Sequence, residues 1–470
     1  MPLRPVSSRA GDPVTASTFD PELIRAYDVN GPRYTSYPTA NLFQENVSAS
    51  TLLEAVGKLD AGAALSLYLH VPFCDTICYY CACNKIVTNN RRHAIGYLEH
   101  LYREMALVSD ALPADHCVEQ LHFGGGTPTY LTNEQLDATF TTLRRSFQLA
   151  EGEERDFSIE IDPRTVDAER IGFLLSLGIN RMSLGIQDFD PAVQTAVNRL
   201  QSEADTAAIM AAARAGGVKS LSVDLIYGLP CQTVEGFRRT LARVVGLGPD
   251  RISLYSYAHL PARFKTQRQI DSNALPGPET KLDILSLAVE RLTEAGYVHI
   301  GMDHFALPDD ELVQAQRDGS LHRNFQGYTT HGHCDLIGFG VSAISSVGTL
   351  YCQNAKTLPG YLAALDAGRH PLERGLILSE DDRMVRGLIG TLMCHFQLDI
   401  GAFEAQWNTS LLDAFPEAWP KLEALERDGL LRLTKEALTV TSKGRYLIRN
   451  VAMAFDRYLP PETAGFSRAI

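Results

Sequence analysis

The chain has 470 residues, of which 45% are hydrophobic and 21% charged, and it carries a formal net charge of -13. This composition is typical of an ordinary globular protein with two or three domains, and it excludes a disordered or fibrous chain. The acidic charge argues against a nucleic-acid binder, because neutralising phosphates requires Lys and Arg clustered on one face.

Residues 1–64 are expected to form a tail, an extended arm and a helix. The opening segment lacks the continuous apolar stretch of a secretory signal, and no run of about 18 apolar residues could span a bilayer. We therefore expect a disordered tail on a cytoplasmic protein, with an organellar transit peptide as the alternative. Two prolines favour an extended arm over residues 31–39, and Thr51 and Glu54 have the spacing of a capping box at the start of a helix.

Residues 65–357 show strand-like and helical segments in alternation. Short apolar or β-branched runs occur at 66–72, 118–123, 157–161, 181–186, 220–227 and 251–257. Apolar residues between them repeat at three- and four-residue spacing, which predicts helices. Strands that alternate with helices pair in parallel through right-handed crossovers, so we expect an α/β fold: a partial parallel (β/α) barrel with its chemistry at the carboxyl ends of the strands.

Residues 358–470 are expected to form a mainly helical C-terminal domain. A helix ending over 422–429, two short strands near 430–433 and 438–441, and a last helix over 443–458 resemble a winged-helix module. Acidic and basic residues are mixed in this segment, so it has no basic face for DNA. We interpret it as a packing or lid domain.

Three cysteines, Cys74, Cys78 and Cys81, follow the first predicted strand with the spacing Cys-x3-Cys-x2-Cys. Soft thiolates suit iron-sulfur clusters, and three of them leave one iron of a cubane free for a cofactor. A zinc site normally needs four ligands, and the next candidate group, residues 331–334, lies far along the chain. The nine cysteines, four of them between residues 74 and 83, fit a reducing compartment. We therefore predict an iron-sulfur cluster, with a zinc knuckle or a fortuitous group of cysteines as the alternative.

A glycine-rich segment, residues 124–129, follows the second predicted strand. Glycines let the backbone approach a ligand closely, and exposed N–H and C=O groups can hold a charged amino-acid moiety. An isolated run of glycines is more often a flexible turn, but this one lies at the same end of the expected barrel as the cysteines. We interpret it as a site for the methionine part of S-adenosylmethionine.

These motifs resemble those of the radical S-adenosylmethionine superfamily, and residues 31–470 resemble the oxygen-independent coproporphyrinogen III oxidase family. The second resemblance is carried by separated motifs at residues 31–39, 83–86, 160–164, 185–189, 198–199, 224–230, 301–305 and 322–330. Chance does not explain a set that is spread over the whole chain.

The resemblance implies a 4Fe-4S cluster on Cys74, Cys78 and Cys81 and two molecules of S-adenosylmethionine. It implies that the first molecule contacts the open iron and Tyr68, Gly125, Glu160 and Ile344. It implies that the second contacts Tyr80, Gly126, Thr127, Gln187, Arg199, Asp224 and Ala258. Arg199 can pair with a carboxylate, and Asp224 and Glu160 with an ammonium or with ribose hydroxyls. The alternative for these two acidic residues is a solvated position at a strand end.

The resemblance further implies oxidative decarboxylation of two propionates of coproporphyrinogen III to vinyl groups, which yields protoporphyrinogen IX in haem biosynthesis. A 5'-deoxyadenosyl radical would take a hydrogen from the β-carbon of a propionate, after which carbon dioxide leaves and one electron passes to an acceptor. The four carboxylates of the substrate call for cations, and Arg33 and Arg323 are the candidates, followed by Arg263, Lys265 and Arg268. Each arginine could instead be a structural salt-bridge partner.

Cys83 belongs to the family motif but is not needed as a cluster ligand, so we treat it as a candidate catalytic residue that could protect, relay or pack. We expect an electron donor such as a flavodoxin or ferredoxin, and a monomer that binds no nucleic acid and has no membrane span. One rival function is that of a related haem-binding chaperone, against which the arm, Cys83 and residues 322–330 argue. The other is a radical enzyme that modifies RNA, against which the acidic charge argues.

Overall fold

The computed structural model describes residues 19–460, and the tail expected over residues 1–18 lies outside them. Six parallel strands run through the middle of its largest sheet: β1 (Ala64–Val71), β4 (Cys117–Gly125), β5 (Asp156–Ile161), β6 (Arg181–Gln187), β7 (Ser220–Tyr227) and β8 (Arg251–Ser256). Each pairs with the next in chain order, as the alternation of strands and helices predicts. The six predicted strands are confirmed.

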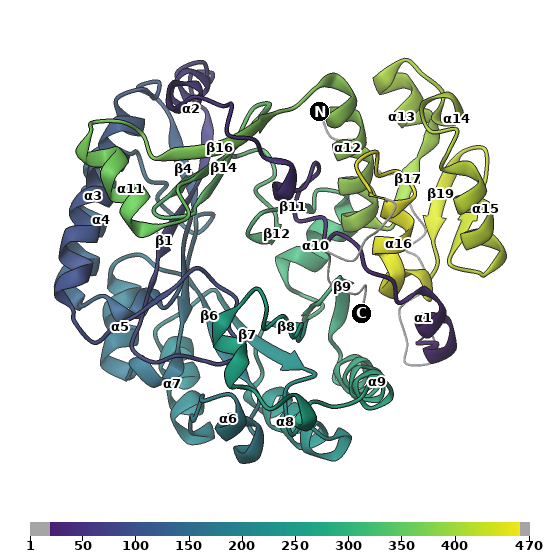
Figure 1. Cartoon of the computed structure of the whole chain (residues 1–470), viewed down its shortest axis with the longest axis horizontal. Helices are drawn as coiled ribbons and strands as arrows, with labels where there is room; N and C mark the ends of the chain where they lie inside the picture. Colours follow the sequence, from purple (N-terminus) through teal and green to yellow (C-terminus); the bar gives the residue numbers. More distant parts are fainter. Residues whose placement is uncertain (1–18, 461–470) are drawn as a thin grey trace.

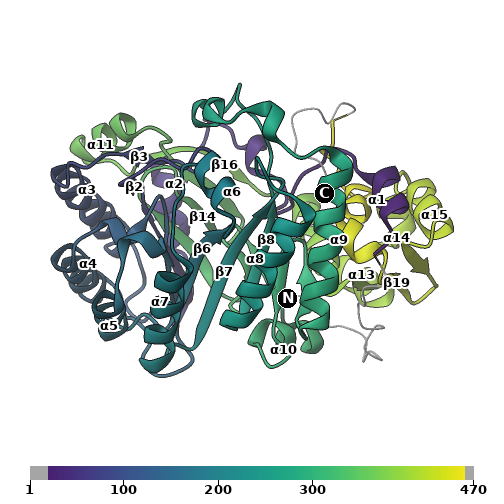
Figure 2. The ribbon, with the colours of Figure 1, turned by 90° about the horizontal axis from the view of Figure 1, so that it is seen from below.

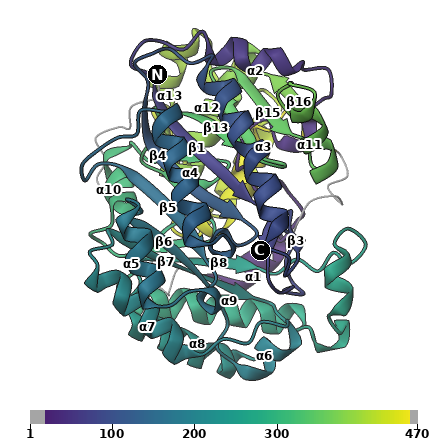
Figure 3. The same cartoon turned by 90° about the vertical axis from the view of Figure 1, so that its left-hand side faces the viewer.

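Helices between these strands, together with α9 after β8, cover the outer face of the sheet (Figure 1). They are α3 (Arg92–Ser109), α4 (Asn133–Ser146), α5 (Ala168–Ser176), α6 (Pro191–Ala196), α7 (Glu203–Ala215), α8 (Val234–Leu247) and α9 (Pro278–Glu294). Figure 3 shows α3 and α4 in front of the strands that they pack against. Leu67, Leu69 and Phe123 of the sheet are fully buried beneath such helices, and each contributes roughly 1.5–3 kcal/mol to stability.

Further strands extend the sheet at both edges, and the sequence did not predict them. They are β13 (Asp335–Phe339), β14 (Ile344–Val347), β15 (Leu350–Asn354) and β16 (Leu372–Ile377) beyond β1, and β10 (His304–Ala306) and β9 (Val298–Gly301) beyond β8. β13 runs parallel to β1, and all the others pair antiparallel. The 12-stranded order begins with β16 and ends with β9, so the sheet is open. The expected partial barrel is confirmed.

The last elements of the sheet bear on the domain boundary expected at residue 358. Helix α11 (Leu358–Asp366) packs on α3, and its Tyr361 and Leu365 belong to the main core. Strand β16 then pairs with β15. The C-terminal core has no member in these elements and begins, along the chain beyond the arm, at Met384. We therefore propose a boundary near residue 378.

The C-terminal part is helical around a small three-stranded sheet. Its helices are α12 (Glu380–His395), α13 (Ile400–Trp407), α14 (Leu411–Ala414), α15 (Trp419–Arg427) and α16 (Ile448–Met453). Its strands are β17 (Gln397–Asp399), β18 (Leu431–Leu433) and β19 (Ala437–Val440), and the last two match the predicted pair. The last helix is shorter than expected, because Leu447 leaves the helical region of backbone conformation and separates a 3-10 turn, Gly444–Leu447, from α16.

The arm, residues 31–39, has neither helix nor strand and runs between the sheet and the C-terminal part (Figure 1). Tyr34 and Tyr37 are buried in the C-terminal core, and the Tyr34 hydroxyl donates to Asp456 (2.8 Å). The Arg449 guanidinium donates to the carbonyl oxygen of Pro32 (2.9 Å). These contacts fix the arm to the C-terminal part.

Short helices flank the arm. Helix α1 (Pro21–Tyr27) lies near α9, where Arg25 pairs with Glu279 (2.5 Å, Figure 2). Helix α2 (Ala49–Val56) begins before the predicted capping box, so the prediction that Thr51 is the N-cap is wrong. The N-cap is Ser48, whose hydroxyl lies 3.0 Å from that of Thr51. Within residues 19–460 we find no helix with the length and hydropathy that crossing a bilayer requires.

Candidate active site

The loop that carries the three cysteines leaves and rejoins the protein through paired backbone. It is bounded by two short parallel strands, β2 (Phe73–Cys74) and β3 (Ile86–Val87). At its tip, the Asn198 side chain donates to the carbonyl oxygen of Ile77 (2.7 Å). The cysteines therefore lie directly beyond the carboxyl end of β1, on a loop that the chain holds at both ends and at the tip.

Hydrogen-bond donors surround two of the sulfurs. The Thr127 hydroxyl lies 3.5 Å from Sγ of Cys74, and the guanidinium groups of Arg164 and Arg199 each lie 3.5 Å from Sγ of Cys78. Burial raises the pKa of Cys74 to about 11, so this thiol ionises only together with a bound metal. Donors of this kind tune the reduction potential of a thiolate-bound cluster.

Cys81 and Cys83 form a thiolate-thiol pair. A hydrogen bond from Cys83, supported by the charge of Lys85, lowers the pKa of Cys81 to about 6, and the same bond raises the pKa of Cys83 well above its usual value. Lys85 also donates to the carbonyl oxygen of Cys81 (2.8 Å). Cys81 is thus the ready ligand, and Cys83 remains a protonated donor beside it.

The sulfurs of Cys74, Cys78 and Cys81 are spread more widely than the ligands of one zinc ion. Tetrahedral zinc with bonds of about 2.3 Å holds its sulfur ligands about 3.8 Å apart. In the part of the chain that the structure describes, these three thiols do not form a group whose sulfurs all lie within 4.8 Å of one another. The spread fits a polynuclear centre.

The glycine-rich segment approaches its neighbours too closely for any side chain. A Cβ at Gly125, whose φ is +117°, would lie 2.8 Å from the His70 imidazole. A Cβ at Gly126 would lie 2.8 Å from the backbone of Pro72 and Phe73. The glycines therefore allow the end of β4 to lie against the base of the cluster loop.

The N–H groups of this segment are used within the protein, which differs from the expectation that they hold a ligand. Gly125 donates to the Glu160 carboxylate (3.2 Å), Gly126 to the carbonyl of Val71 and Thr127 to that of Phe73 (both 2.8 Å). The N–H groups of Gly125, Gly126 and Thr127 are therefore already paired within the protein.

Tyr68 lies beside the glycines, and its hydroxyl is oriented by His70. The Nε2 atom of His70 lies 3.0 Å from the carbonyl oxygen of Asn84, and Nδ1 lies 3.0 Å from the Tyr68 hydroxyl. A carbonyl only accepts, so Nε2 carries the proton and the Tyr68 hydroxyl donates to Nδ1. The Tyr68 ring also stacks on His122, whose Nε2 atom approaches Glu160 (3.4 Å).

Ile344 is brought to the same place by sheet register. Gly338 pairs with Tyr68 across β13 and β1, and a Cβ at Gly338 would lie 2.5 Å from the backbone of Ile344. The structure thus brings Tyr68, Gly125, Glu160 and Ile344 together at the carboxyl ends of β1, β4 and β5.

Asp162 joins the cysteine loop to Arg199. Its carboxylate accepts from Arg164 (2.6 Å) and from Arg199 (3.1 Å), and Arg199 also donates to the carbonyl of Gly185 (2.6 Å). Burial raises the pKa of Asp162, but the charges of Arg199 and Arg164 outweigh it, so that the pKa is lowered overall. Asp162 therefore stays ionised beside the cluster loop.

Gln187 and Asp224 lie next to Arg199. Gln187 has a left-handed φ of 66°, and its Oε1 atom is buried with no hydrogen-bond partner among residues 19–460. Asp224 pairs in register with Gly185, and burial, together with the charge of Glu160, raises its pKa to about 7. The Asp224 carboxyl accepts from the Ser183 hydroxyl (3.5 Å). An amide oxygen without a partner beside a buried carboxyl with a raised pKa is a feature of a polar site built for a ligand.

Tyr80 and Ala258 share one hydrogen-bond donor. The Gln267 amide donates to the carbonyl of Tyr80 (3.0 Å) and to that of Ala258 (3.2 Å). Burial raises the pKa of the Tyr80 hydroxyl, and the positive charge of Arg199 opposes this rise. Tyr80, Gln187, Arg199, Asp224 and Ala258 therefore border one region, next to the Gly126–Thr127 backbone.

Arg33 and Arg323 come together although 290 positions separate them. Burial and the positive charge of Arg323 lower the pKa of Arg33, which forms an ion pair with Asp303. Arg323 lies on β11 (His322–Asn324) opposite Tyr328 of β12 (Gly327–Thr329), with its guanidinium 4.7 Å from the ring centre. Two cations and one carboxylate leave a local excess of positive charge.

Several donors around these arginines lack a partner within residues 19–460. They are Nε and Nη1 of Arg323, Nε2 of Gln326 and Nδ1 of His304, all buried. Burial, followed by the charges of Arg323 and Arg33, lowers the pKa of His304 well below its usual value. Buried polar groups are normally satisfied, so this set indicates a site for an anionic or polar ligand.

Tyr255 connects the two arginines to the glycine-rich end. Burial raises the pKa of the Tyr255 hydroxyl; the charge of Asp224 raises it further, and the charge of Arg33 opposes this rise. The centres of the Tyr255 and His304 rings lie 6.1 Å apart. The arginine group therefore lies across one tyrosine from Asp224. Arg263, Lys265 and Arg268, by contrast, are exposed on or beside the 3-10 segment Lys265–Gln269, which borders the cluster loop.

Sequence reasoning missed four residues of this site: Arg164, Lys85, His70 and His304. Arg164, Lys85 and His304 lie inside motifs that carry the resemblance, and His70 lies four residues before the first cysteine. Asp162-Pro163-Arg164 follows a strand at its carboxyl end, which could have indicated a role. The neighbours of His304 come from the arm and from β11, so its motif alone did not reveal its place in the site.

Comparisons with known proteins agree with this geometry. The radical SAM superfamily profile matches residues 68–244, and the HemN C-terminal domain profile matches residues 378–447. Oxygen-independent coproporphyrinogen III oxidase of Pseudomonas aeruginosa is 51% identical over 96% of this chain and 99% of its own length. The protein of that name from Escherichia coli is 47% identical over 96% and 98%.

A solved structure extends the comparison to three dimensions. Coproporphyrinogen III oxidase (HemN) from Escherichia coli, a radical SAM enzyme, superposes with a TM-score of 0.89 over 94% of this chain and 99% of that chain, at 46% sequence identity. The chain therefore belongs to the oxygen-independent coproporphyrinogen III oxidase family of the radical SAM superfamily.

Proposed function

We propose that this chain is a coproporphyrinogen dehydrogenase that converts two propionates of coproporphyrinogen III to vinyl groups without oxygen, giving protoporphyrinogen IX in haem biosynthesis. The observation that carries the proposal is one juxtaposition. Arg33 of the arginine pair and Asp224 and Glu160 at the strand ends all influence the Tyr255 hydroxyl, and the glycine-rich end of β4 lies against the base of the three-thiol loop. The family relatives carry the same activity in their names.

The donor set fits the cofactors that the radical SAM superfamily implies, a 4Fe-4S cluster and S-adenosylmethionine. Cys74, Cys78 and Cys81 would hold the cluster, and Thr127 and Arg199 donate toward its sulfur ligands. When bound, these groups supply the radical that removes a hydrogen from the substrate. The chain itself fixes the loop, screens the thiolates and keeps water away from the reacting carbon.

We propose two positions for S-adenosylmethionine. Tyr68, Gly125, Glu160 and Ile344 would hold the first, with glycine carbonyls and the Glu160 carboxylate facing an ammonium group. Tyr80, Gly126, Thr127, Gln187, Arg199, Asp224 and Ala258 would hold the second, where the unpartnered Oε1 of Gln187 supplies an acceptor and Arg199 a carboxylate partner. The resemblance to the family supports two molecules rather than one.

Substrate carboxylates would bind Arg33 and Arg323, with Gln326 and His304 as additional donors. Arg323 has two guanidinium nitrogens, Nε and Nη1, without a partner in residues 19–460, so each can donate to a carboxylate oxygen of the substrate. Tyr255 and Tyr328 line the space between the arginines and Asp224. The C-terminal part acts as a lid, because Arg449 and Asp456 hold the arm that carries Arg33.

Cys83 would act through Cys81. Hydrogen bonding from Cys83 lowers the pKa of Cys81, which favours the thiolate that a cluster ligand requires. If Cys83→Ala protein binds iron and turns over substrate normally, Cys83 contributes only to packing.

The partners follow from the chemistry. The cluster needs an external one-electron donor such as a flavodoxin or ferredoxin, and the chain would work as a cytoplasmic monomer. All nine cysteines are free thiols, which supports a reducing compartment.

The proposal is tested by anaerobic turnover. Protein reconstituted with iron and sulfide would be incubated with a reductant, S-adenosylmethionine and coproporphyrinogen III. Protoporphyrinogen IX should appear with one 5'-deoxyadenosine released per vinyl group formed. Cofactor cleavage without any vinyl product would overturn the assignment of substrate.

A further inference from the structure

Three potential metal ligands gather at the end of the barrel opposite the cysteine loop. The ligating atoms of Glu119, His333 and Cys334 all lie within 4.8 Å of one another. Glu119 lies near the start of β4, and Gly125 ends it. Six residues of strand span about 20 Å, so this group is separate from the iron-sulfur site.

A β-bulge brings Glu119 to the group. Leu65 and Ser66 of β1 pair with Val118 and Gln120 of β4, so Glu119 is the extra residue between two pairs. Bulges re-aim a side chain relative to the sheet. Leu65 also pairs with Asp335 at the start of β13, directly after His333 and Cys334. Leu65 of β1 therefore lies between β4, which carries Glu119, and β13, which directly follows His333 and Cys334.

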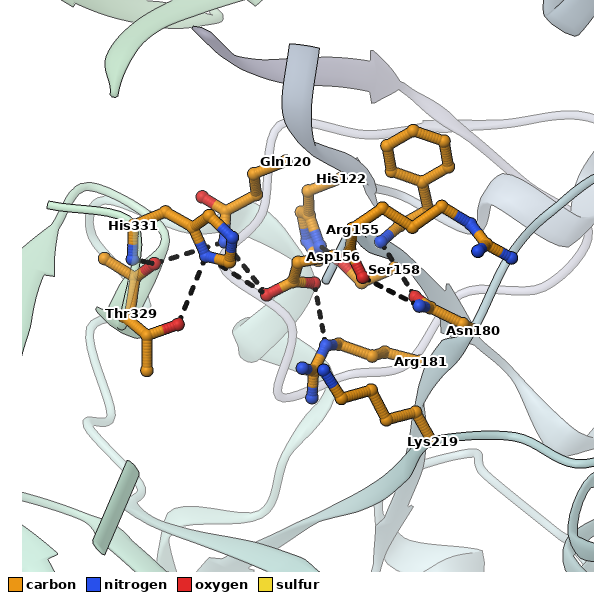
Figure 4. A network of polar contacts seen from close by, with 12 residues as sticks. Gln120, His122, Arg155, Asp156, Ser158, Asn180, Arg181, Lys219, Thr329 and His331 are labelled. Carbon is orange, nitrogen blue, oxygen red and sulfur yellow. Dashed lines mark hydrogen bonds and ion pairs between the residues drawn. The ribbon is translucent and has the colours of Figure 1, made fainter. Parts of the chain in front are cut away.

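The loop that carries His333 and Cys334 is already fixed by buried contacts. The N–H of Cys334 donates to the carbonyl of His331 (3.2 Å), and the N–H of His331 donates to the Thr329 hydroxyl (3.0 Å). Figure 4 shows Thr329 and His331 in a network with Gln120 and Asp156, in which Gln120 donates to both Thr329 (3.2 Å) and Asp156 (3.1 Å). The donor atoms are thus held in place by the protein.

The donor set suits zinc. The Glu119 carboxylate lies 2.7 Å from Nε2 of His333 and 3.9 Å from Sγ of Cys334, which places oxygen, nitrogen and sulfur donors around one point. Zinc accepts all three, whereas calcium and magnesium prefer oxygen alone. Among the described residues, no lysine or arginine forms an ion pair with Glu119. The His333 side chain is 58% exposed, so an ion can enter from solvent.

We propose that Glu119, His333 and Cys334 bind a zinc ion whose fourth position is open to water. The ion ties the segment after β12 to β4. That segment follows the β11–β12 hairpin, which carries Arg323, so the site anchors the base of the substrate-binding hairpin without touching the reacting atoms. A hydrogen bond between a surface histidine and a glutamate is the plain alternative.

The test uses the full chain with its iron-sulfur cluster in place. The protein would be equilibrated with buffered Zn²⁺, and zinc per chain would be measured by elemental analysis. X-ray absorption at the zinc edge is blind to iron. We expect one zinc per chain, with one sulfur at about 2.3 Å and nitrogen or oxygen at about 2.0–2.2 Å. Loss of a supporting contact alone weakens zinc sites about 10–100-fold, so His333→Ala and Cys334→Ser should weaken binding at least tenfold.

Matched controls separate this site from other sources of zinc. His93→Ala and Cys231→Ser remove an exposed histidine and an exposed cysteine elsewhere and should keep full affinity. Zinc in a misloaded cluster site would show several sulfur neighbours and would survive Cys334→Ser. That pattern, or no bound zinc at all, would overturn the proposal. Should Cys334→Ser fail to fold, His333→Ala and Glu119→Gln change more exposed groups and give the same answer.

Discussion

The cysteine loop and the arginine pair are built in opposite ways. Cys74, Cys78 and Cys81 lie within eight consecutive positions, on one loop that follows the carboxyl end of β1. Arg33 and Arg323 are brought together from the arm and from a hairpin near residue 323, with β10 between them. Residues that hold a cofactor can therefore lie in one short sequence motif, whereas residues that bind a large substrate come from distant parts of the chain and meet only in the fold.

The two regions also differ in how their arginines are paired, although each contains two arginines and one aspartate. At the loop, Asp162 pairs with both Arg164 and Arg199. At the arginine pair, Asp303 pairs with Arg33, and two nitrogens of Arg323 have no partner within residues 19–460. Buried donors without a partner favour the binding of an anionic substrate.

The largest effect should come from breaking the loop. Cys78→Ala removes one thiolate and the sulfur that Arg164 and Arg199 approach, so the cluster loses a ligand. We expect turnover to fall at least about 1,000-fold, as for a group that acts as a unit with others. Iron content and product formation measure it. Cys231→Ala changes an exposed cysteine and should retain both; equal iron in the two variants would contradict the loop assignment.

Arg323→Ala should have a smaller effect that is confined to the substrate. A hydrogen bond to a charged group contributes about 1.5–3 kcal/mol, so kcat/KM for coproporphyrinogen III should fall about 10- to 150-fold. Binding of S-adenosylmethionine should not change. Steady-state kinetics and calorimetric titration separate the two.

Arg33→Ala should resemble Arg323→Ala, and Arg145→Ala is the matched control because Arg145 is exposed on α4, away from both regions. Unchanged kinetics in both Arg33→Ala and Arg323→Ala would show that the excess charge does not recognise the substrate.

The contrast between the two regions also explains what the sequence could predict. The six strands and the cysteine loop are local patterns: strand spacing, thiol spacing and a glycine run. Strands β13–β16 were missed because they are short and contain or adjoin glycines such as Gly338 and Gly340, which weaken a strand pattern. Three hydroxyl residues, Ser48, Ser50 and Thr51, lie around the start of α2, and spacing to Glu54 alone favoured Thr51 over Ser48.

Contacts between distant segments could not be predicted at all. Nothing near His304 in the sequence shows that Arg33 and Arg323 surround it. In the same way, the pairing of Glu119 with His333 depends on a bulge and on the order β13-β1-β4, neither of which has a local signature.

Asp162→Asn should have a moderate effect on the binding of S-adenosylmethionine. The amide keeps the shape but removes the charge that Arg164 and Arg199 share, so Arg199 is no longer held toward the proposed second cofactor position. We expect S-adenosylmethionine to bind about tenfold more weakly, with iron content retained. Asp167→Asn, an exposed N-cap nearby, is the control. Loss of iron instead would show that Asp162 supports the cysteine loop and does not position Arg199 for the cofactor.

The smallest effect on turnover should come from Glu104, which lies away from both regions. It is fully buried and accepts from Tyr361 (2.6 Å), Asn354 (2.6 Å) and the N–H of Gly340 (2.8 Å). Burial raises its pKa from 4.5 to about 7. The folded protein therefore keeps a proton that the unfolded chain releases, so stability falls as pH rises from about 4.5 through 7.

Glu104→Gln should remove that dependence. Between pH 5 and 8, the unfolding free energy of the unmodified chain should fall relative to the variant by on the order of 2–3 kcal/mol. Denaturant melts at several pH values measure the difference. Parallel curves for the two proteins would show that Glu104 is ionised throughout.

The central claim is that three thiolates hold a cluster with one iron open to S-adenosylmethionine. Electron paramagnetic resonance of the reduced, anaerobically reconstituted protein tests it most directly, with and without the cofactor. The account predicts a four-iron signal that changes when S-adenosylmethionine is added and is lost in Cys78→Ala. A signal that ignores the cofactor, or protein that contains zinc in place of iron at this loop, would contradict it.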